Sequence, residues 1–133
     1  MTLPMKTYFV VAICMIIWDG IWLTLNKPMY SKMVLKVQNT PMKVKWVPAI
    51  LAYILMYIGM IYFVIPKIIV NSDKSFLNVF KIAGTFGLVV YGIWNMTNMA
   101  IFDRFDYKVA TLDTLWGVLI YSSIAYIAVK YTL

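Results

Sequence analysis

Two aspartates stand among otherwise apolar segments of this chain, and they are its strongest candidates for chemistry. Asp19 follows a run of apolar residues, and Asp113 comes just before another. A charged carboxylate at the centre of a membrane helix costs about 2.5–3.5 kcal/mol on insertion scales, so it usually faces protein and marks a functional site. In that setting a carboxylate can bind a cation, a proton or a hydrogen-bond donor.

Two amides accompany the carboxylates at a similar depth. Asn95 and Asn98 lie in the third apolar segment. Consecutive spans run in opposite directions, so the ends of the first and third segments meet the start of the fourth at one face. At a rise of about 1.5 Å per residue, Asp19 and Asn95 lie about 10 Å below that face, Asn98 about 6 Å and Asp113 about 3 Å. We therefore predict one polar layer, in which Asp19 is within reach of Asn95 or Asn98.

Aromatic residues complete the candidate set. Trp22 follows Asp19 by three positions, as Trp116 follows Asp113. On a helix this spacing places indole and carboxylate side by side, where the indole N–H could donate to the acid. Tyr91 shares a helical stripe with the two amides. The candidate ligand-binding or proton-binding residues are Asp19, Trp22, Tyr91, Asn95, Asn98, Asp113 and Trp116.

Each polar residue also has a purely structural interpretation. For Asn95 and Asn98 it is hydrogen bonding between helices, worth about 0.6 kcal/mol on average in membrane proteins. For Asp113 it is an N-terminal helix cap near the membrane surface. Asp19 is the hardest to explain in this way, because a neutral residue would pack at its depth at lower cost.

The composition argues against several other kinds of site. The chain has no histidine and no glutamate, and Cys14 is its single cysteine. Metal centres need clustered His and Cys ligands, and nucleophilic triads need a base, so we expect no metal, no cofactor and no such catalytic site. The net charge of +7 comes from lysines that flank apolar runs. That placement is typical of headgroup anchors, and we expect no nucleic-acid partner.

A membrane-spanning architecture must position these residues. Of the 133 residues, 63% are hydrophobic and 13% charged, with a mean hydropathy of +0.82. In soluble domains, about 45–50% of residues are apolar and about 25% are charged. Four apolar runs, at about 7–25, 46–66, 81–102 and 111–130, reach the ~20 residues needed to cross the hydrocarbon. We predict an all-α integral membrane four-helix bundle with antiparallel neighbours and no sheet, both termini on one side, and residues 1–133 in a single transmembrane domain.

Prolines and glycines refine this architecture. Pro28 and Pro66 are predicted to end the first and second spans, because proline removes a backbone donor and clashes with the preceding turn. Gly84 and Gly87 lie on the helical stripe that carries the amides. Small residues let backbones approach closely, so this stripe predicts a tight helix–helix contact.

The link between the first two spans is basic. Its residues 29–37 alternate lysines with apolar side chains, a pattern that fits either a helix on the membrane surface or a plain basic loop. In both cases we expect contact with anionic lipid headgroups. The residues concerned are Lys32, Lys36, Lys43 and Lys45.

Three segments of the chain resemble a known family. They are WDGIWL at 18–23, YGIWNMTN at 91–98 and LDTLWG at 112–117. The resemblance covers nearly the whole chain and is to domain of unknown function family 2177, a family of small four-span membrane proteins of bacteria. It implies the four-helix architecture and no particular activity. The family pattern has an acidic residue at the position of Asn95, so the amide here argues against a proton-carrying role for that position.

Three classes of function follow from these residues. The first is a multi-pass membrane protein whose polar layer binds or passes a small ligand, a cation or a proton. The alternative is a non-enzymatic scaffold of a cell membrane or of a virion's internal membrane, which uses the basic link to hold a protein partner, a second copy or anionic lipid. A lysine-rich and isoleucine-rich composition is typical of AT-rich genomes and leaves a viral source open. A lipid-modifying enzyme with Asp19 and Asp113 as acid and base is disfavoured, because the usual membrane-enzyme spacings are missing.

Overall fold

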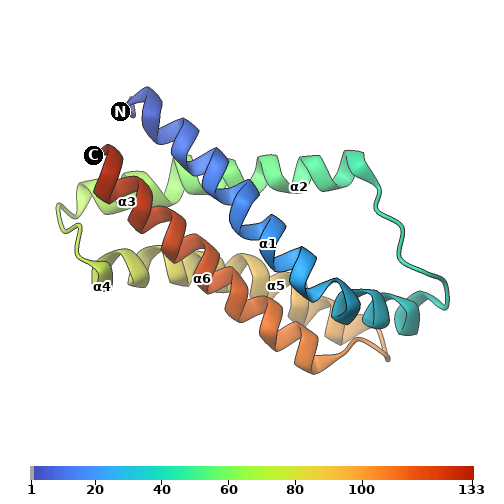
Figure 1. Cartoon of the computed structure of the whole chain (residues 1–133). Coiled ribbons are helices and arrows are strands. Elements are labelled where there is room, and N and C mark those ends of the chain that lie inside the picture. The colour runs from blue at the N-terminus through green and yellow to red at the C-terminus, as the bar shows by residue number, and fades with distance from the viewer. Residues whose placement is uncertain (1) are drawn as a thin grey trace.

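Four long helices make up the described part of the chain. The computed structural model describes residues 2–133, and within that range it contains no strand (Figure 1). The first helix, α1, is Met5–Gln38, and the last, α6, is Tyr107–Thr132. All four are long and apolar enough to cross a membrane, at 5–38, 46–70, 76–101 and 107–132. The predicted all-α membrane bundle is confirmed.

The two middle helices each contain a widened π-helical turn. In the first, α2 (Trp46–Gly59) continues through the turn Met60–Val64 into α3 (Ile65–Val70). In the second, α4 (Phe76–Val79) continues through the turn Phe80–Gly84 into α5 (Thr85–Ile101).

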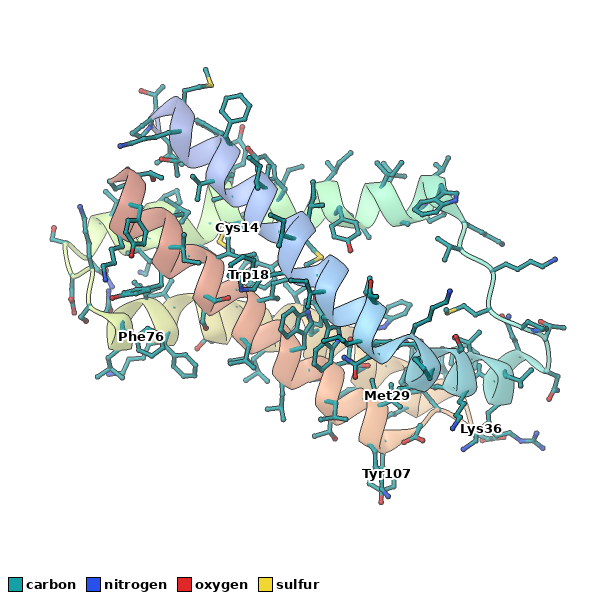
Figure 2. The ribbon with its side chains drawn as sticks, viewed as in Figure 1. Cys14, Trp18, Met29, Lys36, Phe76 and Tyr107 are labelled. Carbon is teal, nitrogen blue, oxygen red and sulfur yellow. The ribbon has the colours of Figure 1, made fainter. Side chains whose placement is uncertain are left out.

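Both termini lie at the same end of the bundle, as expected. The side-chain oxygens of Thr7 and Thr132 are 2.7 Å apart and hydrogen-bonded, and Lys74 Nζ donates to the carbonyl of Leu133 at 2.9 Å. The opposite end holds the α1–α2 and α5–α6 links, and Lys36 and Tyr107 lie there in Figure 2. The α3–α4 link, residues 71–75, therefore lies at the same end of the bundle as the two termini.

The two prolines do not end their helices, contrary to the expectation from the sequence. Pro28 lies inside α1, which changes direction beyond it and runs on to Gln38 (Figure 1). An interior proline costs about 3 kcal/mol, but Met33 and Tyr30 anchor the following segment in tertiary contacts. Pro66 is the second residue after the first π-helical turn, and the N–H of Ile65, which lies between them, bonds five residues back to the carbonyl of Met60. That widened turn accommodates the ring within a continuous helix.

Helix α6 lies at the centre of the bundle. It contributes more buried residues than any other helix, and α1 and α5 pack against it. A Cβ added to Gly87 of α5 would lie 2.1 Å from the carbonyl oxygen of Gly117 of α6, so the two backbones touch there. The close contact predicted from the glycine stripe is confirmed, and Gly84 faces the same helix through Ser122.

Helix α2 diverges from the rest of the bundle at one end. Its first half is largely exposed, with Trp46 at 72% and Leu55 at 68%. In Figure 1, α2 runs away from α1, α5 and α6 toward the end that holds the α1–α2 link. By contrast, Cys14 and Trp18 on α1 pack against the core (Figure 2).

Candidate functional site

Asp19 is held by two neutral donors from two other helices. Its side chain is 7% exposed. Tyr53 of α2 donates its hydroxyl to Oδ2, and Trp116 of α6 donates its indole Nε1–H to Oδ1 at 3.0 Å. Asp19 thus faces protein rather than lipid, and it joins α1 to α2 and α6.

Asp113 is held in the same manner. Tyr30 of α1 donates its hydroxyl to Oδ1, and Asn95 of α5 donates Nδ2–H to Oδ2 at 2.8 Å. Asn95 is 1% exposed and also donates to the carbonyl of Tyr91 at 2.9 Å. Asp113 itself is half-buried.

The two carboxylates are connected through their indoles. The rings of Trp22 and Trp116 stack with centroids 4.7 Å apart and planes 3° from parallel. Trp22 Nε1–H donates to the hydroxyl of Tyr30 at 2.8 Å, and that hydroxyl donates to Asp113. The expected pairing of each indole with the carboxylate on its own helix is therefore wrong. Because α1 packs on α6, each indole serves the carboxylate of the facing helix, one directly and one through a tyrosine.

The structure brings most of the predicted site residues together, with different partners. Asn95 bonds Asp113, and the donors to Asp19 are Tyr53 and Trp116, so the expected pairing of Asp19 with an asparagine is not formed. Tyr91 contributes its backbone carbonyl and packs against Gly117.

The capping interpretation of Asp113 is also wrong. The N-terminal cap of α6 is Asp106, whose side chain accepts from the backbone N–H groups of Lys108 at 2.8 Å and Val109 at 3.3 Å. Asp113 lies in the second turn of the helix, and its carboxylate binds side chains of α1 and α5.

Sequence reasoning missed two members of the cluster. Tyr53 was visible only as one of several tyrosines in the second span, with no spacing to distinguish it from the others. Tyr30 follows Pro28, where the helix was expected to have ended. Only the continuation of α1 past the proline carries its hydroxyl to Asp113.

All four side chains that donate to the carboxylates are neutral. A carboxylate offers about four lone-pair sites, so each aspartate keeps acceptor capacity after its two hydrogen bonds. Neutral donors orient a carboxylate without supplying a counter-charge. The cluster is therefore prepared for an additional donor or cation wherever one can reach it.

A cavity of about 670 Å³ reaches one of the two carboxylates. We call it the link-side cavity, because α1 beyond Trp22, the α1–α2 link and the end of α5 line it. Its polar lining residues are Thr24, Tyr30, Gln38, Asn95, Asn98 and Asp113, and Lys27 also lines it. The remaining lining is mostly apolar: Leu23, Met33, Val34, Val37, Met42, Val44, Trp94, Phe102 and Phe105.

Asn98 lines this cavity with an unused donor. Its side chain is 7% exposed, and its Nδ2 has no hydrogen-bond partner in the described structure. A buried donor without a partner is costly, so such a group in a cavity wall indicates a position for an acceptor atom.

A second cavity, of about 470 Å³, lies between α2 and α5, and we call it the lateral cleft. Its lining is apolar except for Asp113, Tyr91 and Tyr121. The apolar lining residues are Ala52, Leu55, Met56, Phe86, Val90 and Trp94. Asp113 and Trp94 line both cavities, whereas Asp19 lines neither. Asp113 is therefore the accessible carboxylate, and Asp19 is the enclosed one.

Comparison with known proteins identifies a family. The model of DUF2177, described as a predicted membrane protein, matches residues 4–130. No curated protein and no solved structure matches this chain.

Proposed function

The chain belongs to the DUF2177 family of predicted membrane proteins, and from that premise we propose that it binds a small cationic ligand inside the membrane, at Asp113. One observation carries the proposal: Asp113 is a half-buried carboxylate with neutral partners that lines two cavities at once. The other members of the cluster position it.

The electrostatics favour a cation over a neutral ligand. A hydrogen bond between neutral groups in a membrane protein contributes about 0.6 kcal/mol on average. A unit charge about 4 Å from a carboxylate interacts by about 4 kcal/mol at an effective dielectric constant of 20, before desolvation is subtracted. The carboxylate therefore discriminates most strongly by charge.

The position of Asp113 also supports passage of the ligand. It lines both the link-side cavity and the lateral cleft, so a cation bound there has space on two sides. Asp19, which lines neither, supports Trp116 and Tyr53 around the site through its own hydrogen bonds.

The test is a titration of the purified, nanodisc-embedded protein with methylammonium, followed by thermal unfolding. A ligand at 100 times its Kd stabilises the folded state by about 2.7 kcal/mol. We expect wild type to gain stability with concentration, and Asp113→Asn to gain none. Asp103→Asn, at an exposed aspartate of the α5–α6 link, is the matched control and keeps the full response. An equal response in Asp113→Asn would overturn the proposal.

The basic link supports a second, peripheral role. We propose that Lys32, Lys36, Lys43 and Lys45 hold anionic headgroups, since all four side chains are exposed around the end of α1 and the link that follows it. Replacing the four lysines by glutamine is expected to reduce co-purifying phosphatidylglycerol while leaving the methylammonium response unchanged. Unchanged lipid content would contradict this role.

A further inference from the structure

We propose that the ligand is a single-chain amphiphile whose head group carries an amine and an oxygen acceptor, and that it reaches Asp113 sideways from the bilayer through the lateral cleft. This inference rests on the proposed function and names the class of ligand and its route.

The lateral cleft is placed for access from hydrocarbon. Ala52 and Leu55 of α2 line it and are themselves exposed, so its rim meets the lipid. Phe86 and Val90 of α5 form the facing wall. Besides Asp113, the only polar side chains of this lining are those of Tyr91 and Tyr121, whose hydroxyls donate to Met56, so the surface accepts an aliphatic chain more readily than a water-soluble ligand. Ligand sites commonly have volumes of about 300–1,000 Å³, a range that includes this cleft and the link-side cavity.

The carboxylate in the wall that the two cavities share selects an amine. Asp113 and Trp94 line both spaces, so a molecule with its chain in the cleft places its head group beside the carboxylate. Tyr30 and Asn95 occupy one acceptor site on each oxygen of Asp113 and leave room for a charged donor. An ammonium group supplies both the donor and the counter-charge.

The link-side face of this shared wall selects an oxygen. Asn98 lines the link-side cavity one helical turn from Asn95; its side chain is more than nine-tenths buried, and its Nδ2 has no hydrogen-bond partner in the described structure. Lys27 lines the same cavity and donates only. Asn98 and Lys27 thus provide two hydrogen-bond donors in addition to the carboxylate. These donors need an acceptor on the head group, and a simple alkylamine has none. An amine next to a hydroxyl, ether or phosphate oxygen satisfies both sides.

Four probes separate these recognition elements. The complete probe is 2-amino-1-dodecanol. Dodecylamine omits the oxygen, dodecanol omits the amine, and ethanolamine omits the chain. Equilibrium binding of each tritiated probe to the purified protein in nanodiscs is measured per mole of probe in the bilayer, so that simple partitioning into lipid does not count as binding.

For wild type, we expect 2-amino-1-dodecanol to bind about tenfold more tightly than dodecanol, because a hydrogen bond to a charged group contributes that much or more. Asp113→Asn removes this difference. Asn98→Ala removes the smaller advantage of 2-amino-1-dodecanol over dodecylamine and leaves the preference for an amine in place.

Blocking the cleft tests the route. Ala52→Trp, at an exposed position on its rim, is expected to weaken binding of 2-amino-1-dodecanol about tenfold while binding of ethanolamine is unchanged. Ala100→Trp, at an exposed position of α5 that lines neither cavity, is the matched control and is expected to change neither. Leu55→Trp, a second substitution on the rim, repeats the test if Ala52→Trp reduces expression.

The outcomes separate the two proposals. If ethanolamine binds in an Asp113-dependent manner but neither rim variant affects the dodecyl probe, the amphiphile inference is wrong and the proposed function stands. If no amine binds to wild type, both fail. Equal binding of dodecanol and 2-amino-1-dodecanol would also overturn the inference.

Discussion

At the scale of single residues, the site is built from two carboxylates with different exposure. Asp19 and Asp113 each accept two neutral hydrogen bonds, and the stacked indoles of Trp22 and Trp116 connect them. Only Asp113 faces open space. We therefore assign ligand contact to Asp113 and positioning to Asp19.

The partners of Asp19 lead to a graded stability prediction. Asp19→Leu leaves the hydroxyl of Tyr53 and the indole N–H of Trp116 without their acceptor, so we expect it to destabilise the protein by about 1–3 kcal/mol. Asp19→Asn keeps an acceptor oxygen and should cost less than half as much. Resistance to unfolding by SDS in mixed micelles measures both. Asp103→Leu, at an exposed aspartate, is the control, and equal losses for leucine and asparagine would contradict a hydrogen-bonding role.

Trp116 has two functions that substitution can separate. Trp116→Phe keeps an aromatic ring against Trp22 but removes the donor to Asp19, so a loss of about 0.6–1.7 kcal/mol is expected. In a double-mutant cycle with Asp19→Leu, the two losses should be less than additive, because both variants break the same bond. Full additivity would mean that the indole and the carboxylate do not interact. Trp94→Phe, at a residue 64% exposed, serves as the control.

At the scale of helices, contact between α5 and α6 sets the geometry of the site. Gly87 and Gly117 bring the two backbones together, and Asn95 follows two turns after Gly87 on the same stripe. The amide therefore reaches Asp113 because the helices approach so closely.

Adding one methyl group to this contact is expected to be costly. In Gly87→Ala the new Cβ would lie 2.1 Å from a backbone oxygen that no rotamer change can move, so we expect a loss of about 1–3 kcal/mol and a weaker methylammonium response. Gly20→Ala is the matched control, since nothing lies within 4 Å of a Cβ there. SDS-induced unfolding compares the two variants, and similar stability would contradict a backbone contact at Gly87.

At the scale of the whole molecule, the fold has a closed end and a divergent end. Hydrogen bonds join the two termini and the α3–α4 link at one end. Helix α2 separates from the other helices toward the opposite end (Figure 1). The cavities that Asp113 lines lie between the helices, and the link-side cavity adjoins the divergent end. Access from the bilayer is a consequence of this shape.

The arrangement of the ends predicts a labelling pattern. In a Cys14→Ala background, cysteines at Lys36 and Asp103 should react with a membrane-impermeant maleimide from one side of sealed vesicles, and cysteines at Thr2 and Lys74 from the other. All four positions are exposed, so each should react fully once detergent is added. Reaction of Lys36→Cys and Lys74→Cys from the same side would refute the four-span topology.

The sequence by itself determined the four apolar helices of spanning length and the glycine contact. Both depend on distance along one helix: hydropathy sums over about 20 residues, and the glycines share a stripe through the helical period. The helix ends were less accurate, because Pro28 and Pro66 were taken as stops. Tertiary contacts in one case and a π-helical turn in the other carry the helices past them.

Only the tertiary structure decided which polar groups are partners and which carboxylate is open. Asp19 and Asp113 are alike in sequence, each with a tryptophan three residues on, yet one is enclosed and the other lines two cavities. The choice depends on the rotation and tilt of each helix about its neighbours, and these follow from packing across helices rather than from spacing within one. The recruitment of Tyr30 and Tyr53, the crossed indoles and the lateral cleft arise in the same way, because the contacts that create them join residues far apart in the chain.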